Sequence, residues 1–303
     1  MHIMKQPCIT LAKNYALSLA VICSGNIAQA GPDVGAYHFR NLPVPDGAMA
    51  AINNEGTVTG FYYDNTGFAH SFLWQDGLFT ALDAPGWLDT DAFGINNRGI
   101  VVGTYDDQVV QYGFLFDLKA QTWTRLTDPP GTSFNQVNEI KDKGMMVGFA
   151  GGGNYTTLVG WISHRESWSF FTAPDSNGGN ADTFAAGIND RGVVTGYYHD
   201  LQNIWRSFIK DDSKLISITF PGAVETIAFG INNQGDIAGT YAEPGAPPLA
   251  IHGFVLHHGK FTVVDYPGTH GVTFVNGIND RGQLVGNYFD PSGTVPAFLA
   301  TPA

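Results

Sequence analysis

The sequence predicts an all-β fold: a six-bladed β-propeller of four-stranded antiparallel blades, closed by an N-terminal strand that completes the last blade. Three observations predict it. First, two short apolar runs that flank a tight turn, as in residues 226–241, occur six times. Second, the turn glycines at positions 56, 99, 144, 192, 235 and 282 are 43 to 48 residues apart, the period of a four-stranded blade. Third, the last repeat lacks a fourth strand, whereas residues 37–42 resemble a fourth strand without its own first three.

The beginning of the chain has the pattern of an export signal. Lys5 and Lys13 supply positive charge, residues 15–22 form a short apolar segment, and residues 28–30 are an Ala-Gln-Ala cleavage site. The apolar segment is too short to cross a bilayer as a helix. We therefore expect residues 1–30 to be removed and residues 31–303 to form a single propeller domain, secreted or periplasmic.

Composition limits the classes of function. Both cysteines, Cys8 and Cys23, lie in the predicted signal, so the mature chain offers no disulfide framework and no cysteine metal site. A lipoprotein with Cys23 as its lipid acceptor is the alternative. Without the two signal lysines, 13 basic residues face 27 acidic ones, a formal net charge of −14. This argues against duplex nucleic acid and anionic membranes as partners, because both require a basic face. We expect a monomer with no membrane insertion.

The repeated turn defines the elements in order. Asn at its first position and Gly at its fourth favour a type I turn between the first and second strands. The predicted strands are 49–53, 57–63, 71–74 and 78–82 in blade 1, and 92–96, 100–105, 112–116 and 123–126 in blade 2. Blades 3, 4 and 5 cover 137–171, 185–218 and 228–264, and blade 6 has strands 275–279, 283–288 and 297–300. Blade 3 is the most irregular, with Lys141 in place of the leading Asn and a predicted loop at 151–155.

The repeat resembles a known family. Residues 94–96 (Gly-Ile-Asn), 102–105 (Val-Gly-Thr-Tyr), 251–255 (Ile-His-Gly-Phe-Val) and 265–268 (Asp-Tyr-Pro-Gly) match the pattern of the HAF-repeat extracellular proteins. The resemblance covers nearly all of the mature chain. It implies a secreted bacterial protein with a propeller-like fold, and it implies no catalytic residues.

In such a propeller, the second-to-third and fourth-to-first loops lie on one face. They vary in length and sequence, and variable loops on a rigid scaffold commonly carry function. We therefore expect ligand contacts on this variable face. The candidates are aromatic and histidine side chains that could stack on sugar rings or could simply pack between blades: Trp87, Tyr155, Trp205, Tyr266 and His270.

A carboxylate stands eight positions after the turn glycine in five of the six copies. These residues, Asp64, Asp107, Asp200, Glu243 and Asp290, could form a ring that binds Ca²⁺ or sugar hydroxyls. Alternatively, each could begin a turn of its own blade. A Tyr two positions earlier, in the same five copies, could likewise pack between blades.

Blade 3 departs from the repeat in a way that suggests chemistry. Glu139 stands where most copies have Gly, and Lys141 lies two residues further on, so both side chains could face one site. Equally, they could form a structural ion pair. His199, beside Asp200, is a candidate general base. Glu139, Lys141, His199 and Asp200 are therefore the catalytic candidates.

Three functions follow from these features. The first is an exported module that binds a glycan or small molecule, and the second is a carbohydrate-active lyase or hydrolase. The third is a Ca²⁺-assisted ester or lactone hydrolase, which rests on fold analogy alone. An enzyme of the second kind requires Glu139, His199 and Asp200 to converge on one pocket.

Overall fold

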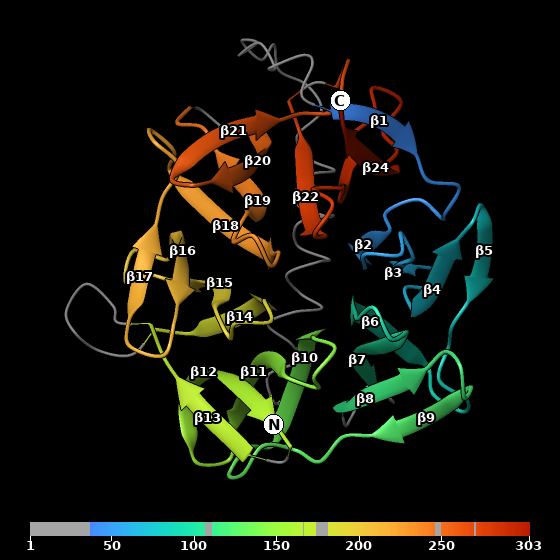
Figure 1. The fold of residues 1–303 in the computed structure, drawn as a ribbon, viewed down its shortest axis with the longest axis vertical. Helices are drawn as coiled ribbons and strands as arrows, with labels where there is room; N and C mark the ends of the chain where they lie inside the picture. The colour runs from blue at the N-terminus through green and yellow to red at the C-terminus, as the bar shows by residue number, and fades with distance from the viewer. Residues whose placement is uncertain (1–36, 107–110, 166, 174–180, 246–249, 270) are drawn as a thin grey trace.

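A computed structural model describes residues 37–106, 111–165, 167–173, 181–245, 250–269 and 271–303. The described chain forms 24 strands in six four-stranded antiparallel sheets, which stand around a central axis in chain order (Figure 1). The predicted six-bladed β-propeller is thus confirmed. No helix in this part of the chain is long and apolar enough to span a bilayer. The predicted signal segment lies outside the described residues.

We letter the strands of each blade A to D from the axis outward. Blade 1 contains β2 (Met49–Ile52), β3 (Val58–Tyr63), β4 (Ala69–Gln75) and β5 (Leu78–Ala81). Blade 2 contains β6 (Asp89–Ile95), β7 (Ile100–Asp106), β8 (Gln111–Asp117) and β9 (Thr122–Arg125). Blade 3 contains β10 (Phe134–Ile140), β11 (Met146–Gly152), β12 (Tyr155–His164) and β13 (Ser167–Phe171).

Blade 4 contains β14 (Thr183–Ile188), β15 (Val194–His199), β16 (Trp205–Lys210) and β17 (Leu215–Ile218). Blade 5 contains β18 (Glu225–Ile231), β19 (Ile237–Ala242), β20 (Ile251–His257) and β21 (Lys260–Val264). Blade 6 contains β22 (Thr273–Ile278), β23 (Leu284–Tyr288) and β24 (Ala297–Pro302), and β1 (Tyr37–Asn41) is its outer strand.

Two kinds of expected boundary were wrong, the starts of A strands and the extent of one loop. Several A strands begin earlier than predicted, because β-bulges let the strand continue past an unpaired residue; in β6 the bulge lies between Ala92 and Gly94. The predicted 151–155 loop of blade 3 is instead a tight hairpin, with Gly152 paired to Tyr155. Gly152 and Gly153 both adopt positive φ, which makes so short a connection possible.

Ring closure depends on strand β1. It pairs antiparallel with β24, with Tyr37 opposite Pro302 and Asn41 opposite Phe298, so that the first and last described strands lie side by side (Figure 1). The Phe39 ring lies edge-on to Tyr266 and Phe298, both at 5.4 Å. Closure therefore covers the β24 edge and adds aromatic packing to blade 6.

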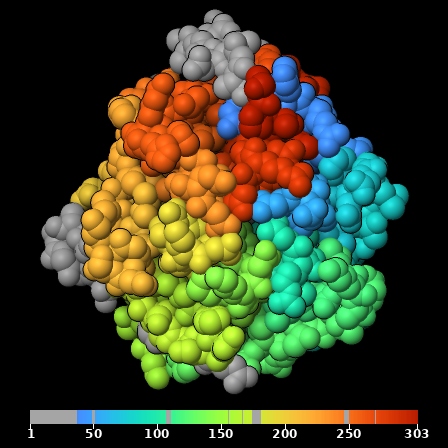
Figure 2. Space-filling view, viewed as in Figure 1, coloured from blue at the N-terminus to red at the C-terminus, as the bar shows by residue number. Residues whose placement is uncertain are grey.

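The core lies between blades as well as within them. In the space-filling view the sectors of the six blades meet around the axis (Figure 2). One apolar cluster, for example, combines Phe149 of blade 3, Phe184 and Tyr197 of blade 4, and Ile227 of blade 5. Close approach near the axis requires glycine: a Cβ on Gly239 would overlap the carbonyl oxygen of Ile227.

The chain also contains two related halves. Residues 57–106 align without a gap with residues 193–242, and 21 of the 50 positions are identical. The equivalent contacts are preserved: Ser71 Oγ donates to the carbonyl oxygen of Thr90 (2.8 Å), as Ser207 Oγ does to that of Thr226 (2.7 Å). Blades 4 and 5 thus correspond to blades 1 and 2, and blade 3 corresponds to blade 6.

Removing β1 should weaken the whole ring. We expect residues 43–303 to melt at least about 10 °C below residues 31–303, because an apolar sheet edge and the Phe39 packing are lost. Circular dichroism melts with size-exclusion chromatography would measure this. Equal melting temperatures for the two chains would show that β1 does not close the ring.

Candidate functional site at the mouth of the central channel

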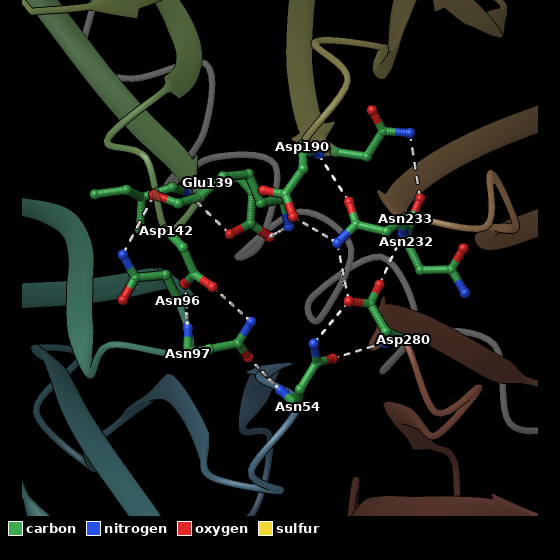
Figure 3. Close-up of polar contacts among 12 residues, drawn as sticks. Asn54, Asn96, Asn97, Glu139, Asp142, Asp190, Asn232, Asn233 and Asp280 are labelled. Carbon is green, nitrogen blue, oxygen red and sulfur yellow. Dashed lines mark hydrogen bonds and ion pairs between the residues drawn. The ribbon is translucent and has the colours of Figure 1, made fainter.

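The mouth of the central channel is formed by the six A–B turns. Their second positions are all Asn or Asp and make up what we call the inner ring: Asn54, Asn97, Asp142, Asp190, Asn233 and Asp280. Together with the neighbouring turn residues, this ring lines a shallow depression that is open to solvent (Figure 3). This ring has a sequence signal, an Asn or Asp at every second turn position, whereas the turn type is predicted by the first and fourth positions alone.

Hydrogen bonds join neighbouring blades at this level. At five of the six junctions, the backbone N–H of an inner-ring residue donates to the side-chain oxygen of the next one, at 2.7 to 2.8 Å. At the same five junctions, the side-chain amide of an Asn at the first turn position donates to a carbonyl oxygen of the next blade. These pairs are Asn53 with Asn96, Asn96 with Lys141, Asn189 with Asn232, Asn232 with Asn279, and Asn279 with Asn53.

The junction between blades 3 and 4, which we call seam 3/4, lacks both bonds among the described contacts. No hydrogen bond joins Asp142 to Asp190 (Figure 3). The first turn position of blade 3 is Lys141, whose ammonium group cannot replace the planar amide of Asn. Seam 3/4 is instead bridged by Asn138, whose Nδ2 donates to the carbonyl oxygen of Ala185 (2.7 Å).

Glu139 and Lys141 lie at seam 3/4. A Cβ at the equivalent Gly94 would point at the backbone of the next blade, and the same geometry directs the Glu139 side chain toward blade 4. Its Oε2 lies 3.8 Å from Lys141 Nζ, with 18% and 21% of the two side chains exposed. In blade 6, which has the consensus residues Gly277 and Asn279, both junction bonds are present.

The environment of Glu139 alters its acidity. Burial raises the pKa of the Glu139 carboxyl group above its ordinary value, and Lys141 and the backbone N–H of Ile140 oppose this rise only in part. A buried carboxyl group of this kind, next to a cation that lines the depression, is suited to proton transfer or to hydrogen bonding with hydroxyl groups.

The structure separates the catalytic candidates. Glu139 and Lys141 lie at the A–B turn of blade 3, whereas His199 ends β15 and Asp200 follows it, on the opposite, variable face of the propeller. The expectation of one shared catalytic pocket was therefore wrong. Burial lowers the pKa of His199, whose ring packs against Trp205 at a centroid distance of 3.3 Å. Asp200 is bonded to Arg206 at 3.0 Å.

The carboxylates proposed as a Ca²⁺ ring belong to separate blades. Asp64 accepts hydrogen bonds from the backbone of Thr66 and Phe68, Asp200 from Gln202 and Ile204, and Asp290 from Ser292; each therefore caps its own B–C turn. Asp107 lies outside the described residues. Within the described ranges, no three His, Asp or Glu side chains are arranged to hold a metal ion. The described carboxylates therefore hold their own loops and do not gather into a shared ring.

The aromatic candidates pack against protein. Trp205 is only 7% exposed. The ring centroids of Trp87 and Tyr105 are 4.6 Å apart, and Tyr266 stacks on Tyr288 with ring centroids 3.7 Å apart. Trp87 and Tyr266 each lie in the loop before a blade, and each ring packs on the Tyr that the repeat places in strand B of that blade. His270 and the Tyr155 side chain lie outside the described part of the structure.

A histidine clamp on the variable face was not foreseen. In blade 5, His252 Nδ1 lies 2.7 Å from Asp265, and its Nε2 lies 3.8 Å from Glu243. His70 bridges Asp83 and Asp64 in the same way at 3.0 and 3.3 Å. Each clamp ties the B–C loop of its blade to the D–A loop. In blade 4, Arg206 aligns with His70 and bonds Asp200.

Restoring the repeat at seam 3/4 should stabilise the ring. We expect Glu139→Gly with Lys141→Asn to raise Tm by about 3 °C, because blade 3 regains an inter-blade amide bond worth roughly 1 kcal/mol and loses a buried acid. Lys141→Asn alone should raise Tm by less, because the buried Glu139 carboxylate then lacks its cation. Differential scanning calorimetry would test this order, and a double variant less stable than wild type would contradict it.

The His252 clamp should make stability depend on pH. Burial by itself lowers the pKa of His252, but the hydrogen bond to Asp265 and the charges of Asp265 and Glu243 outweigh it and raise the pKa overall. The clamp therefore stabilises the fold at pH values below the ordinary pKa of histidine, and this stabilisation is lost as the pH rises through the raised pKa.

His252→Gln should consequently lower Tm by about 5 °C at pH 6, since a hydrogen bond to a charged group contributes roughly 1.5–3 kcal/mol, and by less at pH 9. His38→Gln, at an exposed position, is the control. Melting curves at both pH values would measure the effect. An equal loss at pH 6 and pH 9 would mean that the protonated clamp contributes nothing.

Comparison with known proteins supports the fold. No family model matches the chain, and no curated protein matches it significantly. Among solved structures, a gluconolactonase from Xanthomonas campestris is 11% identical, with coverage of 91% of this chain and 99% of that one and a TM-score of 0.52. An Aleuria aurantia lectin in complex with Fucα1-6GlcNAc is 10% identical, with 84% and 93% coverage and a TM-score of 0.50. The β-propeller domain of the Trilobed protease from Pyrococcus furiosus is 10% identical, with 83% and 81% coverage and a TM-score of 0.51. At these identities the likeness establishes the propeller architecture alone.

Proposed function

We propose that this protein is an exported binding module that captures a glycan or another small polyhydroxylated ligand at the channel mouth. One observation carries the proposal: among the described contacts, seam 3/4 lacks the two inner bonds that the other junctions have, and Lys141, Asp142 and Asp190 line the depression there. The predicted export signal, the resemblance to HAF-repeat extracellular proteins and the lectin among the structural neighbours support it.

The chemistry of the mouth suits hydroxyl groups. The carboxylates of Asp142 and Asp190 accept hydrogen bonds, whereas Lys141 and the amide groups of the inner ring donate them. A sugar presents both donors and acceptors on adjacent carbons, so one molecule could engage several of these groups. Binding sites commonly contain polar groups that lack some of their hydrogen bonds within the protein, and this lowers the stability of the fold.

Ligand binding should therefore depend on seam 3/4. In thermal-shift and calorimetric screens of residues 31–303 against neutral and acidic oligosaccharides, a ligand should raise the Tm of the wild type. The Glu139→Gly, Lys141→Asn variant should bind at least about tenfold more weakly although it is more stable. Leu201→Ala, half exposed on the opposite face, is the control. Undiminished binding by the double variant would place the site elsewhere.

A second function has a specific observation in its favour. The raised pKa of Glu139 suits a general acid or base, so the same site could serve a carbohydrate-active lyase or hydrolase. In that case Glu139→Gln should abolish product release while leaving ligand affinity within a few fold. Assays with and without EDTA would separate this reaction from metal-assisted lactone hydrolysis. Binding without turnover by the wild type would favour the binding module.

A further inference from the structure

Four cations surround the inner ring. The third position of the A–B turns is exposed in all six blades and holds Arg98, Lys143, Arg191 and Arg281 in blades 2, 3, 4 and 6; the other two blades have Glu55 and Gln234. We call these four cations the basic collar. The chain as a whole has a formal net charge of −12, so this grouping is opposite in sign to the overall charge.

Contacts place the collar directly beside the inner ring. Arg98 Nη1 donates to the carbonyl oxygen of Asp142 at 3.4 Å. In blade 4, Arg191 extends over the turn of blade 5, where its Nη2 lies 3.3 Å from the position that a Cβ on Gly235 would occupy. Each of these arginines thus leans toward the next blade along the rim of the mouth.

No collar cation forms a close ion pair within the described part of the chain; Arg98 acts on Asp117 only as a nearby charge that helps to lower its pKa. The ion pairs found there involve His70, Arg125, Lys141, Arg206, His252 and His257, and none of the four collar residues. The inner-ring carboxylates instead accept backbone and amide N–H groups, as Asp142 does from Asn97 and Asp280 from Asn233. The collar is therefore free to pair with an external anion.

We propose that the ligand of the channel mouth is an acidic glycan, a chain of carboxylated sugars. This inference rests on the binding function proposed above and specifies its ligand class. The collar arginines bind the carboxylates, for which the guanidinium fork is well suited, and the inner ring with Lys141 binds the hydroxyl groups between them.

Nucleic acid fits this surface less well. Proteins that bind single strands combine basic residues with aromatic side chains on which bases stack. None of the six A–B turns, at 53–56, 96–99, 141–144, 189–192, 232–235 and 279–282, contains an aromatic residue. Sugar hydroxyl groups can also donate hydrogen bonds to the inner-ring carboxylates, which the phosphodiester groups of a nucleic acid cannot do.

A matched ligand pair tests the proposal. Residues 31–303 would be titrated by isothermal calorimetry with an oligogalacturonate and with its methyl ester, which has the same sugar chain without the charges. We expect the acid to bind at least about tenfold more tightly than the ester at low salt, and this advantage to shrink as salt is added.

Variants then assign the effect to the collar. Arg98→Gln with Arg191→Gln should weaken binding of the acid about tenfold and leave the affinity for the ester unchanged. Lys119→Gln with Lys214→Gln removes the same charge from exposed C–D turns and should have little effect. An equal loss with this control pair would overturn the assignment to the collar.

The outcomes separate the two proposals. Equal affinity for acid and ester, with binding still lost on restoring seam 3/4, would overturn the acidic-glycan inference and leave the binding function standing. Tighter binding to a single-stranded DNA oligomer than to the oligogalacturonate would also overturn the inference. Binding of neither sugar, nor of any glycan in the wider screen, would overturn both.

Discussion

The bonds between neighbouring A–B turns are the interaction on which the rest of the structure depends. A single four-stranded blade cannot bury both of its faces, so each blade needs its neighbours on either side. Near the axis, the N–H groups and amides of one turn bond the oxygens of the next, and these bonds set blade spacing where the strands are closest. Farther from the axis, aromatic side chains pack at the distances that this blade spacing allows. Phe220, for example, stacks on Tyr241 with ring centroids 3.6 Å apart.

A closed ring tolerates one weak junction because the other five and the β1–β24 pairing hold it in place. Seam 3/4 is this weak junction. Glu139 and Lys141 replace residues that blade 6 keeps as Gly277 and Asn279, and the two related halves of the chain therefore differ at the level of the inner ring. A departure from the repeat that weakens local packing is more readily explained by function than by folding.

The two faces of the propeller have different roles. On the variable face, carboxylates cap turns or hold His70, His252 and Arg206, so the loops there are fastened to their own blades. On the turn face, uniform short hairpins present the inner ring and the collar toward solvent. Among the described residues, the collar cations and the depression of the channel mouth lie on the uniform face. Net charge alone conceals this, because it sums over the whole chain whereas the collar is local.

The sequence by itself determined the architecture. The spacing of the turn glycines set six blades, Asn and Gly set the A–B turns, and the incomplete first and last repeats determined closure by β1, because these are local or strictly periodic signals. It also marked Glu139 and Lys141 as departures from the repeat. Only the tertiary structure decided that His199 lies far from Glu139 and that second turn positions 43 to 48 residues apart form one ring. Such contacts depend on how blades are arranged around the axis, and no local pattern in the chain encodes which side chains then meet.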